Sequence, residues 1–342
     1  MKKVASSSSR KADHIRINLE KNVQSGVSNG LEKYRFVHQA LPEINLADVV
    51  TRTEFFGRSL QAPILISSMT GGTKAACAIN RSLAWAAQRT GVAMGLGSLR
   101  PALESPALVS SYRVRDVAPD ILLLSNLGAI QLNYGYSVDE CRRAVDVVEA
   151  DALILHLNPL QEALQPEGNT EFAGLLEKIE AVCRAISVPV VVKEVGWGIN
   201  GETARRLAMA GVAAIDVAGA GGTSWSQVEK HRTRSRDAAQ RAALFQDWGL
   251  PTAEALVDCR RAVPDLPLIA SGGIRDGLEV AKCVGLGAGL AGIAGPLLPA
   301  AVKGAAAVEA ELQRRIGELR VAMFAAGAKD LASLRDIPLQ KT

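Results

Sequence analysis

Short apolar segments recur along the chain from about residue 60 to residue 293, and each gives way to polar or glycine-rich sequence. Segments this short that are apolar throughout are typical of strands buried on both faces of a parallel sheet. They predict eight strands, which end near Ile66, Gly95, Leu124, Leu155, Val192, Asp216, Ile269 and Gly292.

Helical patterns fill the intervals between these segments. Ser137 and Glu140 have the spacing of a capping box at a helix start. Apolar residues from Leu175 to Ile186 recur at three- and four-residue spacing, and residues 201–209 read as another helix. Strands alternating with helices imply right-handed βαβ units, and eight such units favour an α/β fold of the (β/α)₈ TIM-barrel type over an open sheet.

Two segments do not follow this alternation of strands and helices. Residues 1–60 form an N-terminal extension in which residues 1–9 read as a flexible tail, the stretch to about Val23 as amphipathic, and residues 41–60 as an irregular segment or hairpin. The barrel is expected over residues 61–342. Residues 224–248 are a charged insertion after the sixth strand, and they form either a lid over the barrel mouth or a surface and subunit contact.

The charge, the apolar segments and the cysteines limit which partners and which cellular compartment we expect. A net charge of +4 over 342 residues is mild and argues against nucleic acid as a partner. Residues 283–302 form a 20-residue uncharged window, but its five Gly and two Pro divide it into strand, turn and helix start, so a membrane span is rejected. The five cysteines form no C-x-x-C pair and the N-terminus has no apolar signal core, so we expect a cytoplasmic protein.

Glycine-rich turns follow the last three strands, where barrels of this type commonly bind phosphate. Backbone N–H groups and hydroxyls in such turns suit a phosphate group, and turns after both of the last two strands strengthen the signal. The residues predicted to hold the phosphate are Gly222, Thr223, Gly272, Gly273, Arg275, Ala294 and Gly295.

A lysine at the end of the fifth strand indicates what carries the phosphate. Lys193 follows the apolar run 190–192. Burying its charge costs roughly several kcal/mol unless an anion compensates it. Reduced FMN supplies such an anion, because it carries negative charge at N1 and O2. Ser68, Met69, Thr70 and Asn126, which follow the first and third strands, would then line the flavin ring.

The fourth strand ends in a group of polar residues that needs partners. His156, Asn158, Gln161 and Glu162 follow within seven residues of the apolar run, and Pro159 breaks the extended segment. A ligand or a metal would supply those partners. The alternative is a polar turn that happens to hold a histidine. Arg10 and Lys11, likewise, form either a mobile anion clamp or the solvated start of a helix.

These motifs together closely resemble those of the type 2 isopentenyl diphosphate isomerases, a family of FMN-dependent (β/α)₈-barrel enzymes of isoprenoid synthesis. The resemblance covers every barrel element, and its most specific parts are the Arg-Lys start and the His-x-Asn-x-x-Gln-Glu segment. The matching segments are Arg10-Lys11-x-Asp13-His14-Ile15, Ser68-Met69-Thr70-Gly71-Gly72, Ser98-x-Arg100, Ser125-Asn126, His156-x-Asn158-x-x-Gln161-Glu162, Lys193-Glu194, Gly221-Gly222-Thr223-Ser224, Ser271-Gly272-Gly273-Ile274-Arg275 and Ala294.

The resemblance implies interconversion of isopentenyl and dimethylallyl diphosphate on reduced FMN, with NADPH as the reductant and Mg²⁺ as a second cofactor. It implies that Glu162 ligates Mg²⁺, a hard cation that prefers oxygen ligands, and that Gln161 and His156 are catalytic. A homo-oligomer, either a tetramer or an octamer, is also expected. The residues that it assigns to the substrate are Arg10, Lys11, Ser98, Arg100, His156, Asn158 and Gln161; to FMN it assigns Ser67, Ser68, Met69, Thr70, Ser98, Asn126, Lys193, Gly222, Thr223, Gly272, Gly273, Arg275, Ala294 and Gly295.

The identity of the acid is left open by these residues. Protonating an unactivated alkene needs a strong acid, and the neutral amide of Gln161 is a weak one. Our hypothesis is that N5 of the reduced flavin carries the proton while Gln161 relays or orients it. Alternatively, Gln161 only holds its loop by a hydrogen bond.

Three other functions compete with this interpretation. A flavin-dependent 2-hydroxy-acid oxidase or dehydrogenase would share Lys193 and the glycine turns, but it usually has a histidine on the side of the seventh strand, and the four histidines here lie elsewhere. A nucleotide dehydrogenase would need a cysteine after the sixth strand, where this chain has none. A non-catalytic phosphate-binding barrel would leave Lys193 and Glu162 without a role.

Overall fold

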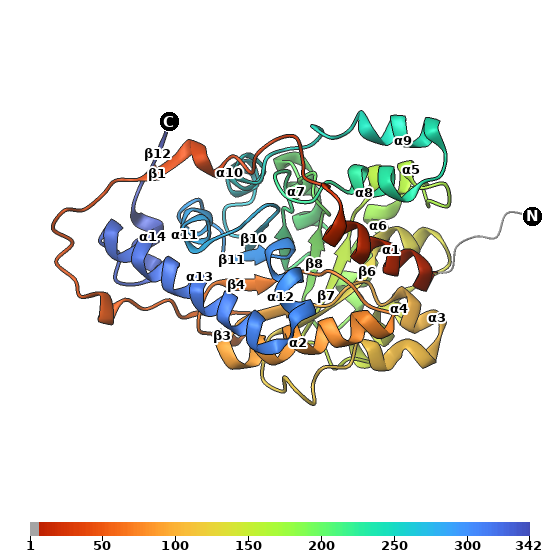
Figure 1. Ribbon diagram of the computed structural model, residues 1–342, viewed down its shortest axis with the longest axis horizontal. Helices are drawn as coiled ribbons and strands as arrows, with labels where there is room; N and C mark the ends of the chain where they lie inside the picture. Colours follow the sequence, from red (N-terminus) through yellow and green to blue (C-terminus); the bar gives the residue numbers. More distant parts are fainter. Residues whose placement is uncertain (1–6) are drawn as a thin grey trace, which may run out of the picture.

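Eight parallel strands form a closed barrel at the centre of the molecule (Figure 1). The computed structural model describes residues 7–342, with side chains from Lys11 onward. The strand order around the barrel is β10-β11-β4-β5-β6-β7-β8-β9, so neighbours in sequence are neighbours in the sheet. The strands are β4 (Ile64–Ile66), β5 (Ala93–Gly95), β6 (Leu123–Gly128), β7 (Ala152–His156), β8 (Val190–Lys193), β9 (Ala214–Asp216), β10 (Leu268–Ser271) and β11 (Leu290–Ile293).

The predicted barrel and its eight strands are confirmed. The third strand, β6, ends at Gly128 and not near Leu124 as predicted, so Asn126 lies inside the strand and does not follow it. Each strand is buried on both faces except at His156, which ends β7 half-buried at the barrel mouth. This is why the segments read as uninterrupted apolar runs and not as an alternation of apolar and polar residues.

Helices follow every strand and cover the barrel from outside (Figure 1). The capping box at Ser137 and Glu140 opens α4, and the two other predicted helices are present as α6 and α7. The helices are α2 (Lys74–Thr90), α3 (Arg100–Glu104), α4 (Val138–Asp146), α5 (Pro159–Leu164), α6 (Leu175–Ala185), α7 (Gly201–Met209), α8 (Trp225–Arg232), α9 (Arg236–Ala243), α10 (Thr252–Ala262), α11 (Gly277–Gly285), α12 (Leu298–Lys303), α13 (Ala305–Ala326) and α14 (Leu331–Asp336).

Aliphatic side chains fill the barrel, and a hairpin closes its amino-terminal end. Leu65, Ile154 and Ile269 belong to an interior cluster that also contains Phe55, from the hairpin β2 (Thr53–Phe55) and β3 (Arg58–Leu60). Each such side chain contributes about 1.5–3 kcal/mol when it is fully buried. In the described part of the chain the hairpin covers this end of the barrel, and the cavity lies at the carboxyl ends of the strands.

The N-terminal extension runs along the outside of the barrel from one end of the molecule to the other (Figure 1). Helix α1 (Ser7–Glu20) lies beside α8, and β1 (Tyr34–Phe36) pairs antiparallel with β12 (Leu339–Lys341) near the C-terminus. The expectation of a flexible tail over residues 1–9 is wrong for residues 7–9, which belong to α1; residues 1–6 lie outside the described part of the chain. The predicted hairpin within residues 41–60 is confirmed as β2–β3. The division of the chain at residue 60 stays a prediction.

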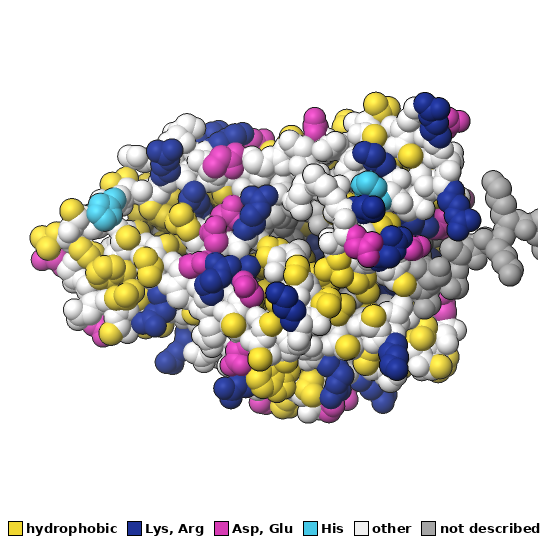
Figure 2. All heavy atoms as spheres, viewed as in Figure 1, with side chains coloured by type: hydrophobic (Ala, Val, Ile, Leu, Met, Phe, Trp, Pro, Cys, Tyr) yellow, Lys and Arg dark blue, Asp and Glu magenta, His cyan; other side chains and the backbone are white. Residues whose placement is uncertain are grey.

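Acidic and basic side chains are interspersed over the face of the molecule shown in Figure 2, in keeping with the mild net charge. Within residues 7–342, no helix is both long and apolar enough to cross a membrane.

Candidate active site

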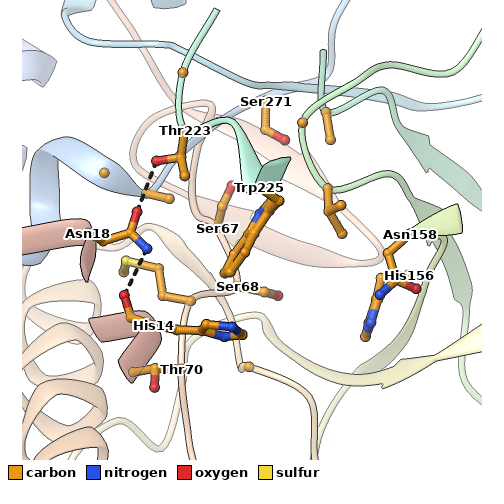
Figure 3. A pocket seen from close by; sticks show the side chains of 18 of the residues that line it. His14, Asn18, Ser67, Ser68, Thr70, His156, Asn158, Thr223, Trp225 and Ser271 are labelled. Carbon is orange, nitrogen blue, oxygen red and sulfur yellow. Dashed lines mark hydrogen bonds between the residues drawn. The ribbon is translucent and has the colours of Figure 1, made fainter. Parts of the chain in front are cut away.

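The carboxyl ends of the strands surround a cavity of about 530 Å³, which is within the range of small-molecule sites. Figure 3 shows its polar lining, with Trp225 and His14 in contact and His156 and Asn158 across the view. All the predicted cofactor residues line this cavity, as do the predicted substrate and metal residues other than Arg10: Lys11, Ser67, Ser68, Met69, Thr70, Ser98, Arg100, Asn126, His156, Asn158, Gln161, Glu162, Lys193, Gly222, Thr223, Gly272, Gly273, Arg275, Ala294 and Gly295. The side chain of Arg10 lies outside the described residues.

The two glycine-rich loops after β9 and β10 interlock at the level of their backbones. Gly273 has φ 77°, and a Cβ there would lie 2.4 Å from the carbonyl oxygen of Gly221. Gly272 has φ 106°, and its Cβ would lie 2.0 Å from the carbonyl oxygen of Gly219. Glycine is therefore required in this loop both by the left-handed backbone and by the contact between the loops. The resulting cradle of backbone atoms suits a phosphate group.

The extension is hydrogen-bonded to this cradle. Thr223 Oγ1 donates to Asn18 Oδ1 of α1 over 3.2 Å (Figure 3). Backbone bonds join the same segments, since Ser25 N donates to Gly222 O and Ser224 N donates to Val23 O, both over 2.8 Å. On the other side, Arg275 Nη2 donates to Gly221 O over 3.0 Å. The extension thus forms one wall of the cavity.

Lys193 is 8% exposed at the end of β8, and its charge has a protein partner. Its Nζ lies 3.5 Å from Oδ2 of Asp216 and donates to Glu194 O over 2.7 Å. The neighbouring strand β9 therefore supplies a carboxylate partner for Lys193, which was not predicted from the sequence; the contact of Lys193 with a flavin stays a prediction. Asp216 follows the apolar run 213–215, so the rule applied to Lys193 would have singled it out.

Glu194 fixes the loop after β8 instead of pairing with Lys193. One of its oxygens, Oε2, accepts from the backbone N–H groups of Val195, Gly196 and Trp197, each over 2.6 Å. Burial raises the pKa of Glu194 to about 7, although these N–H groups and the charge of Lys193 favour the ionised form.

Asn126 joins the predicted flavin side of the cavity to the predicted substrate side. Its Nδ2 donates to Ser68 Oγ over 2.9 Å, and its Oδ1 lies 2.8 Å from His156 Nδ1. An amide oxygen only accepts, so this orientation of the amide puts a proton on Nδ1 of His156. The Nε2 atom of a neutral His156 is then the acceptor nitrogen of the ring.

The polar segment after β7 folds into one hydrogen-bonded group at the start of α5. Asn158 Nδ2 donates to Gln161 Oε1 over 3.2 Å and to Glu162 Oε1 over 2.9 Å. The other oxygen of Glu162 accepts from Asn169 N over 2.6 Å. Pro159 begins α5, and the resulting turn places the Asn, Gln and Glu side chains together.

A second ring of polar residues supports this group from α8. Glu229 Oε1 accepts from Gln161 Nε2 (3.3 Å) and Gln165 Nε2 (2.8 Å), and it lies 3.3 Å from His14 Nε2 of α1. Arg232 Nε donates to the other oxygen over 2.6 Å. Burial alone would raise the pKa of Glu229, but hydrogen bonding to His14 and the charges of His14 and Arg232 outweigh it and lower the pKa to about 2.

Two predicted cations line the cavity near α3. Lys11 Nζ donates to Ser98 O and to the hydroxyl oxygen of Tyr112, each over 2.7 Å. Burial raises the pKa of Tyr112, so its hydroxyl remains a donor to Ser98 O, over 2.8 Å. Arg100 pairs with Glu104 over 2.7 Å. Lys11 thus lines the cavity and is hydrogen-bonded to the protein; its role as an anion clamp stays a prediction.

Buried polar atoms without partners indicate that the cavity holds a ligand. Ser67 Oγ and Asn158 Oδ1 have no hydrogen-bond partner within the described part of the chain, although both residues line the cavity. Such atoms are costly unless a ligand or water satisfies them. With the glycine cradle and the cation of Lys193, they fit a phosphorylated, electron-rich cofactor such as FMN.

The cavity offers fewer groups that could hold a metal ion than groups that could hold FMN. Among residues 7–342, no group of three or more His, Cys, Asp or Glu side chains could hold a metal ion. Mg²⁺ usually keeps several waters and binds through one or two carboxylates plus substrate phosphates. Glu162 fits that arrangement only if the substrate completes the coordination shell.

The insertion over residues 224–248 contributes to the wall of the cavity through its first helix. In α8, Ser226 and Val228 are fully buried, and Trp225 lies in edge contact with His14, with 5.0 Å between the ring centroids. Helix α9 is exposed at half of its residues, and Ala242 is buried. Whether residues 224–248 act as a lid or as a subunit contact stays a prediction.

Sequence reasoning missed several residues that the fold brings to the cavity. They come from elements far apart in sequence. Asn18 follows His14 by one helical turn, and Trp225 directly follows the Gly-Gly-Thr-Ser turn, so both had a local signal. Nothing local marks the others. The missed residues lining the cavity include Asn18, Gln131, Gln165 and Trp225; His14 belongs to the predicted Arg-Lys motif, but no role was assigned to it.

Comparison with known proteins assigns the chain to a family. The family model for FMN-dependent dehydrogenases matches residues 157–341. An isopentenyl-diphosphate delta-isomerase of Nostoc sp. is 52% identical over 332 residues, covering 97% of this chain and 95% of that protein. An isopentenyl-diphosphate delta-isomerase of Rickettsia bellii is 50% identical over 331 residues, covering 97% of both.

Solved structures of mandelate oxidase have the same fold. One in complex with (S)-2-phenylpropionate is 24% identical and superposes with a TM-score of 0.68, covering 98% of this chain and 97% of the other. At this identity the likeness concerns the fold alone, whereas the isomerase relatives are at least 50% identical over 97% of the chain. The chain belongs to the FMN-dependent dehydrogenase family and, by its full-length relatives, to the isopentenyl-diphosphate delta-isomerases.

Proposed function

We propose that this protein interconverts isopentenyl diphosphate and dimethylallyl diphosphate with reduced FMN as its cofactor. The observation that carries the proposal is the division of one cavity into two unlike halves. One half has interlocked glycine loops and the cation of Lys193; the other has His156, Asn158, Gln161 and Glu162 in one hydrogen-bonded group. Full-length relatives named isopentenyl-diphosphate delta-isomerase support the choice of reaction.

The flavin half is proposed to hold FMN. The loops after β9, β10 and β11 would hold its phosphate, and Lys193 would face the electron-rich edge of its ring. Ser68, Met69, Thr70 and Asn126 would line the ring. When bound and reduced by NADPH, FMN would supply the group that exchanges a proton with the alkene. A proton carried by the bound flavin would then do what the neutral amide of Gln161, a weak acid, does not.

The substrate half is proposed to hold the diphosphate and its Mg²⁺ ion. Lys11, Arg100 and His156 offer cationic or hydrogen-bonding groups on one side of the cavity. Glu162 would ligate Mg²⁺ together with diphosphate oxygens. Arg10 is assigned to this half by resemblance alone.

Gln161 is proposed to orient the alkene and relay a proton. It is 7% exposed, and its amide is held on both sides, since Nε2 donates to Glu229 and Oε1 accepts from Asn158. An amide fixed in this way offers one remaining N–H and one lone pair in a set direction. Pre-organisation of this kind raises the fraction of bound substrate in a reactive position.

The test is conversion of isopentenyl diphosphate by the purified protein with FMN, NADPH and Mg²⁺, each omitted in turn. We expect dimethylallyl diphosphate only in the complete mixture, and proton exchange at the allylic position only with reduced flavin. Exchange that persists without flavin would exclude the flavin as the proton carrier and return that role to Gln161.

A 2-hydroxy-acid oxidase is the second candidate, favoured by the fold alone. The segment after β10, residues 271–276, contains no histidine to take a proton from a hydroxy acid. Anaerobic mixing of FMN-loaded protein with mandelate and lactate tests it. Bleaching of the flavin by either acid would support this candidate against the isomerase.

The proposal also covers the cellular compartment, the oligomeric state and the partners of the enzyme. We propose a cytoplasmic homo-oligomer, a tetramer or an octamer, without nucleic acid or membrane partners. The five cysteines are all unpaired, as a reducing compartment would have them. Light scattering on the FMN-loaded protein would give the oligomeric state.

A further inference from the structure

Asp216 is a buried carboxylate beneath the cavity. It ends β9 and is 1% exposed, and it does not itself line the cavity. The parallel register places it directly beside Lys193 of β8 and beside Ile269 of β10. A carboxylate without access to water retains its charge only if cations and hydrogen-bond donors surround it.

The contacts of Asp216 all lead to groups that line the cavity. Its Oδ1 accepts from Ser271 Oγ over 2.7 Å and from Ala218 N over 3.2 Å. Ala218 has φ 39°, a left-handed conformation that a residue with a Cβ rarely adopts, and the bond to Asp216 holds it there. The other oxygen, Oδ2, has no hydrogen bond in the described structure and lies 3.5 Å from Lys193 Nζ.

Asp216 is also the one carboxylate within ion-pairing distance of Lys193 among the described residues. Glu194 is adjacent in sequence, but its Oε2 is engaged by three backbone N–H groups of its own loop. The field that Lys193 exerts on a ligand therefore depends directly on Asp216. With the carboxylate in place, part of the ammonium charge is compensated by the protein.

We propose that Asp216 is a positioning residue that holds Lys193 and the Ala218 and Ser271 loops in place and sets the preference of the site for reduced over oxidised FMN. The inference rests on the proposed FMN site. The reduced flavin ring carries negative charge whereas the oxidised ring is neutral, so compensation of Lys193 weakens the preference for the reduced form. Removing the charge of Asp216 strengthens it.

The experiment compares the midpoint potential of bound FMN, measured anaerobically by equilibration with a reference dye, in wild-type protein and in Asp216→Asn. We expect the affinity ratio of reduced to oxidised FMN to rise about tenfold, which is a shift of about 30 mV to more positive potential for a two-electron couple. An unchanged or more negative potential would overturn the proposal.

The matched control is Asp151→Asn. Asp151 is also a partly buried, ion-paired carboxylate, but it lies at the amino-terminal end of β7, where it pairs with Arg115 over 2.8 Å. We expect an unchanged potential, although the protein loses stability. An equal shift in the control would mean that the effect is not specific to Asp216 and would overturn the proposal.

A second comparison separates the charge from the fold. In Lys193→Met, Asp216 has no ammonium charge to compensate, so its proposed effect on the flavin through Lys193 is removed. Adding Asp216→Asn to that variant should then leave the potential unchanged, whereas a purely structural role would lower FMN affinity equally in both backgrounds. This comparison can still be made if the single variant Asp216→Asn does not fold. A change in midpoint potential between Lys193→Met and the double variant overturns the proposal. If the wild-type protein binds no FMN, both the proposed function and this inference are overturned. If the wild-type protein is an active isomerase but the midpoint potential is unchanged in Asp216→Asn, this inference alone is overturned.

Discussion

Glu229 is expected to contribute more to stability than any surface carboxylate, and replacing it tests the proposed network around Gln161. It is 2% exposed and accepts hydrogen bonds from Gln161, Gln165 and Arg232. In Glu229→Gln the charge is lost, and an NH₂ group replaces one of two oxygens that both face donors. Both changes leave polar groups buried without partners.

The magnitude follows from the pKa of Glu229, which is lowered from 4.5 to about 2. One pKa unit corresponds to 1.36 kcal/mol, so the ionised carboxylate stabilises the fold by about 3 kcal/mol. Because the folded pKa lies below the unfolded one, this stability is fully present above pH 4.5 and is lost as the pH falls towards 2. At pH 7 the variant should lose all of it.

The assay is urea unfolding at pH 7 and at pH 4, followed by fluorescence and circular dichroism, whose coincident transitions would establish two-state behaviour. We expect Glu229→Gln to lower the free energy of unfolding by about 3 kcal/mol at pH 7 and by less at pH 4. The control is Glu202→Gln, on an exposed turn of α7, which should change it by less than about 0.5 kcal/mol. A loss below about 1 kcal/mol at pH 7, or one independent of pH, would refute the reasoning.

Further predictions concern the two halves of the cavity. Lys11→Ala should raise KM for isopentenyl diphosphate at least about tenfold, since a hydrogen bond from a charged group is worth about 1.5–3 kcal/mol, while FMN affinity stays unchanged in a fluorescence titration. Glu162→Gln should raise the Mg²⁺ concentration for half-maximal activity about tenfold or more; an unchanged Mg²⁺ dependence would exclude Glu162 as a ligand. Gly273→Ala should reduce FMN affinity at least about 100-fold because its Cβ would clash with Gly221 O. Gly317→Ala on α13, whose Cβ would have nothing within 4 Å and which does not line the cavity, should retain binding in the same titration.

The barrel could be predicted from the sequence because its determinants are local. Each strand begins as a buried apolar run, and the run gives way to polar residues or glycine where the chain reaches the barrel mouth. The same rule located the candidate site, since polar residues such as His156 and Lys193 directly follow strand cores. Once eight strands are placed in a barrel, the carboxyl ends must converge, and the site residues with them.

The supporting residues could not be predicted, because they meet only after folding. Glu229 lies on α8 and contacts residues of α5 and α1 that are distant in sequence. Asp216 has a local signal, but its role depends on the register that sets it beside Lys193. The glycine loops were interpreted as open to a ligand, whereas Gly272 and Gly273 are required first by the contact between two loops. Local sequence patterns indicate which residues are buried. They do not indicate which side chains pair between elements that are distant in sequence.

Asn126 shows how the pairing matters for the proposed reaction. One side chain bonds both Ser68, on the proposed flavin side, and His156, on the proposed substrate side. Its donor and acceptor are both used, so a change in the position of Ser68 would be transmitted to the tautomer and ring orientation of His156. Proton transfer between a cofactor and an alkene requires the two to be held at fixed separation. A short, fully hydrogen-bonded link at the ends of neighbouring strands β6 and β7 meets that requirement more rigidly than two independent loops would.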